Sequence, residues 1–382
     1  MTTLAGLRIG RRQWLAAAAL PAVSAIVSGC ASRTAGVGPA ATPGWLPYQR
    51  RFARVRVSPD RVIRTVVGLR PFRRPGFRVA VEKIDDKVVV HNYGHGGGGV
   101  TLSWGTADLA AELALQSGLR RFAVIGCGAV GMATARLLQQ RGCSVTIYAK
   151  DLPPNTTSNV SGAQWGPFSV VDRDRRTPEF MTQFVRASRF SYRYFQNLTG
   201  ERYGVKWIEN YVLSDEPSAA APLPEVEGLL PESRDLRPGE HPFPARYVRM
   251  FASMFVEPPV YLPALEADVR QAGGRIDVRE IRDRSELASL AEPGVINCTG
   301  LGARALFNDE EMLPIKGQLH VLLPQPEVDY LVLAPDLYMF PRRDGILLGG
   351  TFERGEWSLE PNHDAEKRIL DGHSRIFRDL AP

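Results

Sequence analysis

The hydrophobic pattern of this chain predicts an α/β protein. Short apolar runs at 88–90, 121–125 and 144–149 have the length and composition of buried strands. One helical pattern follows the first run, from about Leu102 to Leu115, and a second lies between the other two runs. Strands and helices that alternate in this way are typical of a parallel sheet with helices on both faces, the doubly wound fold.

The pattern beyond residue 170 predicts one long helix and an exposed loop. Residues Glu179–Asn197 read as a helix, and four aromatic residues in it are interpreted as core rather than as cofactor contacts. These are Phe180, Phe184, Phe190 and Tyr194. Residues 214–242 are rich in Pro and Glu, which predicts an exposed loop.

Residues 1–30 resemble an export signal rather than part of the fold. A twin-arginine motif is recognisable at 11–15 (RRQWL), and the apolar stretch after it is short for a transmembrane helix. The stretch ends at VSGC, which resembles a bacterial lipobox with Cys30 as the lipidated residue; simple cleavage and a plain anchor helix are the alternatives. We therefore expect an exported, periplasmic or cell-envelope protein with a membrane tether through Cys30, and a flexible linker over residues 31–60.

Composition and charge narrow the possible partners. Hydrophobic residues make up 44% and charged residues 23%, as in ordinary globular proteins. Much of the excess positive charge, +6 overall, lies in the first 80 residues, so we expect no nucleic-acid partner. The four cysteines are too scattered for a disulfide framework, and no Cys/His spacing indicates a metal site.

The segment GCGAVG at 126–131 carries the strongest chemical signal. It follows the predicted strand at 121–125 and opens the second helix, which is the context that a dinucleotide-binding GxGxxG motif requires. Gly126 permits the tight turn, Gly128 lets a pyrophosphate approach the backbone, and Gly131 allows the helix to lie close to the strand.

The phosphates of a dinucleotide would meet the helix N-terminus at Ala129 and Val130, where free N–H groups favour negative charge. An acidic residue about 20 positions further on is expected to bind the ribose. Asp151 is close to that place, although Lys150 occupies the usual position. The motif alone does not decide between FAD and NAD.

Four further stretches resemble the D-amino-acid oxidase family of FAD-dependent enzymes. The first two are the threonine-rich loop NTTSNVSGAQW at 155–165 and the strand end VINCTG at 295–300. The others are the glycine loop HNYGHGGGGVT at 91–101 and the motif GLRP at 68–71. Four consecutive glycines that open a helix leave bare N–H groups for a flat ring or an anion, although a flexible surface loop is the alternative.

The resemblance covers roughly residues 60–382 and implies FAD as the cofactor. It implies that Arg70 and Tyr338 bind the substrate carboxylate and that the carbonyl of Gly97 accepts a hydrogen bond from the substrate amine. Arg70 as a surface arginine and Tyr338 as a packed strand aromatic are the alternatives. Besides the glycine motif and Asp151, the cofactor-binding residues that it implies are Gly96, Gly98, Gly99, Val100, Thr101, Thr157 and Ser158.

The resemblance also implies the reaction. Hydride passes from the Cα of a D-amino acid to the flavin without a protein base, dioxygen is the final acceptor, and the products are a 2-oxo acid, ammonia and hydrogen peroxide. Phe352 stands where relatives with acidic substrates tend to carry arginine, which favours neutral substrates. Ala334 stands where the family often has a second tyrosine, which predicts a more open pocket. The alternatives are a flavin oxidase or dehydrogenase of glycine, sarcosine or another amine, and a non-catalytic lipid-anchored relative.

The order of the motifs differs from that of the family. GLRP and the glycine loop normally come after the NCTG segment, whereas here they precede the dinucleotide motif. We therefore expect a circularly permuted chain, rejoined through residues 116–121; a damaged gene is the alternative. The expected fold is an FAD-binding Rossmann-like lobe interleaved with a substrate lobe that has a mixed, largely antiparallel sheet. The FAD lobe is expected at 87–168 and 260–306, and the substrate lobe at 62–86, 169–259 and 307–382.

Overall fold

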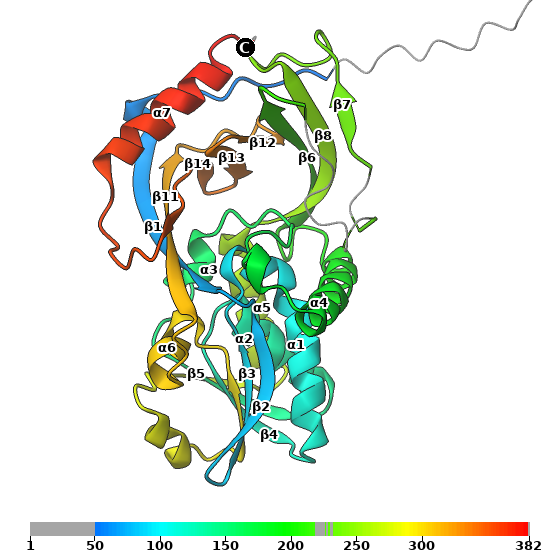
Figure 1. Ribbon diagram of the computed structural model, residues 1–382, viewed down its shortest axis with the longest axis vertical. Helices are drawn as coiled ribbons and strands as arrows, with labels where there is room; N and C mark the ends of the chain where they lie inside the picture. The colour runs from blue at the N-terminus through cyan, green and yellow to red at the C-terminus, as the bar shows by residue number, and fades with distance from the viewer. Residues whose placement is uncertain (1–49, 218–225, 227, 230–231, 381–382) are drawn as a thin grey trace, which may run out of the picture. The chain divides into compact units, whose positions relative to one another are not determined.

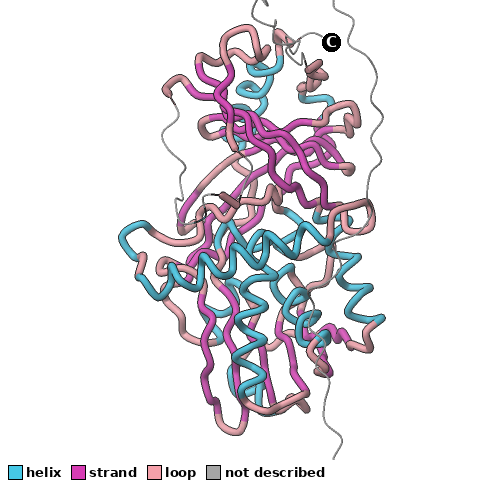
Figure 2. Tube along the Cα trace, turned by 90° about the vertical axis from the view of Figure 1, so that its right-hand side faces the viewer, coloured by secondary structure: helices cyan, strands magenta, loops and turns pink. Residues whose placement is uncertain are grey.

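The computed structural model describes residues 50–217, 226, 228–229 and 232–380, which build two β-sheets and the helices around them (Figures 1 and 2). The predicted export signal, Cys30 and the first part of the predicted linker lie outside the described residues. Among the described residues, none of the helices combines the length and apolar character needed to cross a bilayer.

The first sheet has six strands in the order β2-β3-β10-β4-β5-β9. All neighbouring strands are parallel except β2, which runs antiparallel to β3. Their bounds are β2 (Arg78–Ile84), β3 (Lys87–Tyr93), β4 (Arg121–Ile125), β5 (Ser144–Ala149), β9 (Arg275–Val278) and β10 (Gly294–Asn297). All four residues of β10 are buried, as expected for a parallel strand that is covered on both faces.

Helices cover both faces of this sheet, which confirms the predicted α/β fold. Successive residues of β3 face opposite ways, so Val90 packs into one hydrophobic cluster and Val89 into another. The cluster around Val90 includes residues of α1 (Gly99–Gln116), α2 (Ala129–Gln140) and α5 (Pro258–Gln271). The cluster around Val89 includes residues of the 3₁₀ helix Arg284–Ser289 and of α6 (Ala303–Leu306).

The second sheet has nine strands, in the order β1-β11-β14-β13-β12-β6-β8-β7, with β15 also paired to β11. Only β12 and β6 are parallel, which confirms the expected mixed, largely antiparallel sheet. Helix α7 (His363–Phe377) packs against β11, β13 and β14. The strand bounds are β1 (Val62–Arg73), β6 (Val205–Ser214), β7 (Arg234–Leu236), β8 (Tyr247–Val256), β11 (Met312–Leu322), β12 (Tyr330–Ala334), β13 (Leu337–Arg342), β14 (Gly345–Gly349) and β15 (Glu353–Arg354).

Helix α4 (Pro178–Asn197) forms where the hydrophobic spacing predicted a helix. Thr177 caps its N-terminus by accepting a hydrogen bond from the N–H of Phe180. The helix crosses α1 so closely that a Cβ atom at Gly105 would lie 1.9 Å from the carbonyl oxygen of Ala187. Its position corrects the predicted lobes, because α4 packs on a helix of the FAD lobe although its sequence was assigned to the substrate lobe.

Two other boundaries also differ from the expectation. Strand β2 lies within 62–86, which was assigned to the substrate lobe, but it pairs with β3 and so belongs to the six-stranded sheet.

The end of the predicted linker is packed against the second sheet rather than free in solvent. Phe52 lies 5.0 Å from Tyr211 and 5.2 Å from Tyr330 between ring centroids, and Val55 is buried in the same cluster. Apolar residues at these two positions make the segment part of the core.

Candidate active site

Strands β1 and β13 bring Arg70 and Tyr338 together. Arg70 Nη2 donates to the hydroxyl of Tyr338 at 3.3 Å, and Nη1 donates to the carbonyl oxygen of Thr351 at 3.4 Å. Both side chains are partly exposed, so a ligand can reach them. The two residues that the sequence assigned to a substrate carboxylate therefore lie at one place.

The hydroxyl of Tyr338 is protonated at neutral pH. Burial raises its pKa above the ordinary value, and the neighbouring charge of Arg70 lowers it only in part. The Tyr338 ring also lies 4.9 Å from the ring of Phe340, which fixes its plane from one side. A neutral phenol can donate a hydrogen bond to a carboxylate while Arg70 supplies the charge.

The glycine loop lies at the N-terminus of α1, as the 3₁₀ helix Gly96–Gly98. A Cβ atom at Gly96 would lie 2.3 Å from the carbonyl oxygen of Ser169, and one at Gly98 would lie 2.7 Å from Val170 Cγ2. These two glycines are therefore required by packing within the chain. Gly97 is exposed, and a Cβ at Gly99 would have no neighbour closer than 3.8 Å, so these positions are open to a ligand.

One predicted flavin contact needs correction. The N–H of Gly98 donates to the carbonyl oxygen of His95 at 3.0 Å, because the backbone makes a 3₁₀ turn there, so this donor is already used. The N–H groups of Gly99, Val100 and Thr101 belong to the first turn of α1, and an α-helix leaves its first N–H groups without an intrahelical partner. These three remain the candidate donors to a flavin edge.

The two histidines of the glycine loop contact other side chains of the protein. His95 Nε2 lies 2.9 Å from Thr106 Oγ1, and complete burial lowers the pKa of His95 to about 3. His91 lies between Glu82, with Nε2 2.9 Å from Oε2, and Asn297, with Nδ1 3.1 Å from Nδ2. His91 thus connects the glycine loop to the NCTG segment, a link that no local sequence pattern indicates.

The predicted dinucleotide turn has the geometry that its glycines suggested. Gly126 has a φ of 111°, and a Cβ there would lie 2.5 Å from the carbonyl oxygen of Cys298. A Cβ at Gly131 would lie 2.0 Å from the carbonyl oxygen of Gly126, so the helix can approach the strand only with glycine at this position. At Gly128 the nearest atom would be Ser158 Oγ, at 3.0 Å. Gly128 is thus the position of the three at which an added Cβ would meet only the end of a side chain and no backbone atom.

The threonine-rich loop joins this turn to the carboxylate pair. Its short helix α3 (Thr157–Val160) places Ser158 Oγ where it accepts a hydrogen bond from the N–H of Ala129 at 3.1 Å, at the N-terminus of α2. On its other side, Val160 Cγ1 would lie 2.9 Å from a Cβ at Gly68 of β1. The GLRP strand, the threonine-rich loop and the glycine turn are thus contiguous.

Asp151 is the predicted site residue with the least structural support. Its side chain is 51% exposed, and its nearest charged partner is Lys150, with 3.9 Å between Nζ and Oδ2. Its contact with a ribose stays a prediction. In the part of the chain that the structure describes, no three His, Cys, Asp or Glu side chains are grouped to hold a metal ion.

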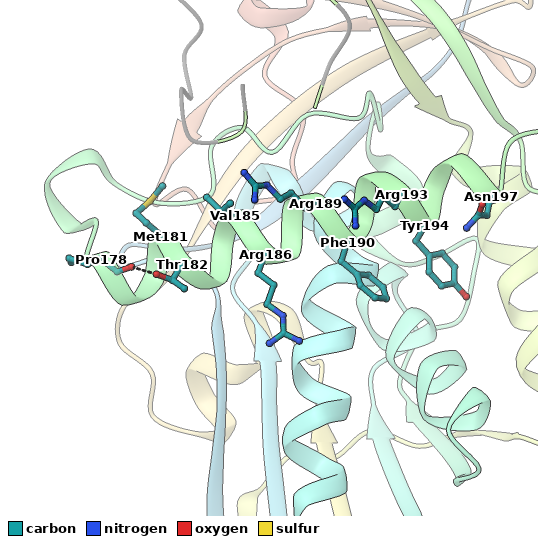
Figure 3. Close-up of a pocket in the computed structure, with 10 residues that line it drawn as sticks. All are labelled: Pro178, Met181, Thr182, Val185, Arg186, Arg189, Phe190, Arg193, Tyr194 and Asn197. Atoms are coloured by element: carbon teal, nitrogen blue, oxygen red, sulfur yellow. Dashed lines mark hydrogen bonds between the residues drawn. The ribbon is translucent and has the colours of Figure 1, made fainter. Parts of the chain in front are cut away.

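An open groove of about 880 Å³ runs along α4 and is separate from these residues (Figure 3). Figure 3 shows Arg189 and Arg193 on one side of the helix and Phe190 on the other. All of its described lining residues belong to α4, and none was assigned to the cofactor or the substrate. The groove is therefore not the candidate active site.

Comparison with known proteins supports one family. The family model described as FAD dependent oxidoreductase (DAO) matches residues 8–113 and 121–382. A D-amino-acid oxidase of Rubrobacter xylanophilus is 31% identical over 258 residues, which cover 65% of this chain and 75% of the relative. A D-amino-acid oxidase of Streptomyces coelicolor is 31% identical over 269 residues, which cover 68% of this chain and 78% of the relative. A D-aspartate oxidase of Homo sapiens is 29% identical over 259 residues, which cover 65% of this chain and 74% of the relative.

Solved structures share the fold. Glycine oxidase from Geobacillus kaustophilus gives a TM-score of 0.51 at 19% identity, over 68% of this chain and 79% of that one. Glycine oxidase from Bacillus cereus gives 0.50 at 16% identity, over the same shares. At such low identity the likeness shows the fold alone.

Proposed function

Because this chain belongs to the DAO family of FAD-dependent oxidoreductases, we propose that it oxidises neutral D-amino acids to 2-oxo acids and ammonia, with dioxygen as the acceptor. FAD is the cofactor of the family, and the chain is an amine oxidoreductase of this type. The choice of D-amino acids among possible amines is the part that we propose.

A single observation carries the substrate class. Among the described residues, the hydrogen-bond partners of Arg70 are two neutral oxygens, those of Tyr338 and Thr351, and no carboxylate pairs with it. A partly exposed guanidinium without a counter-ion is a ready partner for a carboxylate, which it can bind through two N–H groups. The hydroxyl of Tyr338 lies beside it as a further donor. The pair therefore supports a substrate with a free carboxylate.

The two glycine turns fit FAD. At Gly128 an added Cβ would meet only the hydroxyl of Ser158 and no backbone atom, so a pyrophosphate can approach the N-terminus of α2. Gly97 is exposed, and a Cβ at Gly99 would have no neighbour closer than 3.8 Å, so a ligand can approach the first turn of α1. Bound FAD would supply the hydride acceptor for the substrate Cα and the route of the electrons to dioxygen. The chain itself orients the amino acid: Arg70 and Tyr338 hold the carboxylate, and the exposed carbonyl of Gly97 accepts a hydrogen bond from the amine.

The preference for neutral side chains has its own support. Phe352 is 58% exposed and supplies no charge. The nearby Arg354 is already neutralised, because its Nη atoms donate to both carboxylate oxygens of Asp172 at 2.8 and 2.6 Å. An acidic substrate side chain would have to compete with that bidentate pair.

The proposal is tested with purified residues 31–382. We expect yellow protein that produces hydrogen peroxide with D-alanine and not with L-alanine, and that turns over D-aspartate more slowly. Yellow protein that oxidises only glycine or sarcosine would replace D-amino acids with another amine. Folded, colourless and inert protein would contradict the oxidase assignment.

We also propose that the chain is circularly permuted. The order of its motifs and the match of the family model in two pieces, separated at residues 114–120, support this. The hydrophobic cluster that includes Leu380 near the C-terminus also contacts Val62, the first residue of β1, so the ends that the family order would join lie at one cluster. A Cβ atom added at Gly118, in the exposed turn between α1 and β4, would have no neighbour within 4 Å, so the proposed join lies in an open turn.

We further propose export by the twin-arginine route and lipidation at Cys30, on the grounds of the RRQWL and VSGC motifs. Mass spectrometry of the protein from the membrane fraction is expected to show Cys30 as a lipidated first residue. Unmodified Cys30, or a mature N-terminus beyond it, would contradict lipidation.

A further inference from the structure

We propose that Arg368, on helix α7, is a positioning residue for the substrate carboxylate site. Its guanidinium holds the backbone segment on which the ring of Tyr338 lies, and so keeps the Tyr338 hydroxyl beside Arg70. This inference rests on the proposed function, because it concerns the support of the same carboxylate site. Figure 1 shows α7 next to the strands that carry the site.

The ring of Tyr338 lies directly against the backbone of two glycines. A Cβ atom at Gly349 would lie 2.2 Å from the ring, and one at Gly350 would lie 2.5 Å from it. No side chain separates the ring from this segment. The place of the Tyr338 hydroxyl therefore depends on the place of the Gly349–Gly350 backbone.

Arg368 fixes that backbone from outside the site. The carbonyl oxygen of Gly350 accepts a hydrogen bond from Arg368 Nη2 at 2.6 Å, and Nη1 donates to the carbonyl oxygen of Asp336 at 3.4 Å. Asp336 in turn accepts a hydrogen bond from the N–H of Gly350 at 3.3 Å. One guanidinium thus connects the turn before Tyr338 with the segment beneath its ring, through hydrogen bonds from a charged donor.

The same helix supports the strand of Tyr338 one turn further on. His373 Nε2 lies 3.1 Å from the carbonyl oxygen of Tyr338 itself. Gly372 lets α7 approach closely, since a Cβ atom there would lie 2.5 Å from Leu337 Cδ1. Arg368, Gly372 and His373 therefore contact three consecutive parts of one hairpin.

Helix α7 is itself anchored to β11, the strand that pairs with β1 next to Arg70. Gln318 of β11 donates from Nε2 to the carbonyl oxygen of Asn362 at 3.0 Å, and its Oε1 accepts from the Asn362 N–H at 2.6 Å. Ile369 and Phe377 are buried in the core beneath the helix. The helix is therefore a fixed support, and Arg368 transmits its position to the site.

Arg368 differs from an ordinary surface arginine in its acceptors. Among the described residues it pairs with no carboxylate, and its two acceptors are the carbonyl oxygens of Asp336, two residues before Tyr338, and of Gly350, beneath the Tyr338 ring. It is exposed and makes no contact with a group assigned to the substrate or cofactor. Its loss is therefore expected to change carboxylate binding much more than stability.

The test is a double-mutant cycle between Arg368 and Tyr338. The variants Arg368→Gln, Tyr338→Phe and the double variant are prepared with FAD bound. The Kd of benzoate, a simple carboxylate, is read from the visible spectrum, alongside the KM of D-alanine, the bound FAD and the Tm. Lys367→Gln, an exposed change on the same helix, is the matched control.

We expect Arg368→Gln to raise the Kd of benzoate and the KM of D-alanine by about tenfold, with kcat and bound FAD little changed. The double variant is expected to bind benzoate as Tyr338→Phe does, because Arg368 acts through the hydroxyl. Arg368→Lys, which keeps a charged donor, is expected to restore part of the affinity, and Lys367→Gln to change nothing.

An unchanged Kd in Arg368→Gln would overturn the proposal. An equal effect with and without the Tyr338 hydroxyl would overturn it as well. If Arg368→Gln loses FAD, the cycle made with Arg368→Lys decides by the same criterion. Wild-type protein that binds neither benzoate nor D-alanine would contradict the proposed function. That result differs from an additive cycle, in which benzoate binds but the effects of the two substitutions are independent, and which would contradict only the role of Arg368.

Discussion

Arg70 and Tyr338 meet across two intervening strands. They stand on β1 and β13, which are separated in the sheet by β11 and β14, yet Arg70 Nη2 lies 3.3 Å from the Tyr338 hydroxyl. Each of the two intervening strands carries a glycine beneath one of these side chains: β11 beneath Arg70 and β14 beneath Tyr338. A Cβ at Gly317 of β11 would lie 2.7 Å from Arg70 Nη1, and one at Gly349 of β14 would lie 2.2 Å from the Tyr338 ring. The two side chains can lie flat over the sheet because these glycines leave the space.

Replacement of Arg70 tests the carboxylate site. Arg70→Lys keeps the charge but loses the planar pair of donors, so kcat/KM for D-alanine is expected to fall roughly ten- to a hundredfold. Steady-state kinetics measure the effect, and an unchanged flavin spectrum confirms that the cofactor is retained. Activity within twofold of the wild type would show that the substrate carboxylate binds elsewhere.

Replacement of Gly105 tests the contact between α1 and α4. In Gly105→Ala the new Cβ would meet the backbone carbonyl of Ala187 at 1.9 Å, which only a shift of one helix can relieve. The free energy of unfolding is expected to fall by about 2–3 kcal/mol, measured by chemical denaturation. Gln116→Ala, at the exposed end of the same helix, serves as the control and should stay within about 0.5 kcal/mol of the wild type.

Stability is expected to decrease in acid because of buried histidines. The pKa of His95 is lowered from 6.5 to about 3 by burial, so below 6.5 the unfolded chain binds a proton that the folded chain does not. The stability that neutral, buried His95 allows is fully present above pH 6.5. The free energy of unfolding then falls by about 1.4 kcal/mol per pH unit as the pH decreases toward 3. Urea unfolding at several pH values measures the slope, and the slope should become smaller in His95→Gln. An equal slope in the variant would assign the acid sensitivity to other groups.

A chain in the family order tests the permutation. Residues 121–380 followed by 50–116, joined by a short Gly/Ser linker, should fold and bind FAD with the same visible spectrum as the natural order. Its KM for D-alanine should be within a few-fold of the natural value, because the hydrogen bonds that the described residues make to Arg70 and Tyr338 lie away from the new junction. A rearranged chain that is insoluble, beside an active natural chain, would contradict the proposal.

Much of the architecture could be predicted from local sequence. The turn at Gly126, the strands on either side of α2 and the helix over 178–197 each depend on residues near one another in the chain. The mixed sheet and the FAD-dependent family followed from motifs that extend over a few residues each. Arg70 and Tyr338 were identified from such motifs, and the structure brings them together.

The remaining differences all involve distant partners. Strand β2 belongs to the six-stranded sheet because of its pairing with β3, and α4 joins the FAD lobe because Gly105 and Ala187 allow close contact. Phe52 is part of the core because of three aromatic partners far along the chain. None of these partners can be recognised from the segment itself.

The sequence by itself determined the local backbone and the chemistry of the site, because glycine turns, helix starts and charged side chains act over a few residues. The tertiary structure decided which of those pieces support one another. Only the tertiary structure shows that Gly317 lies beneath Arg70 and that the Gly98 N–H donates to His95 within the loop. It also shows that Arg368 holds the carbonyl of Gly350, beneath the ring of Tyr338. The physical reason is that such contacts depend on the packing of strands and helices that are remote in sequence, and that packing is settled only when the whole core forms.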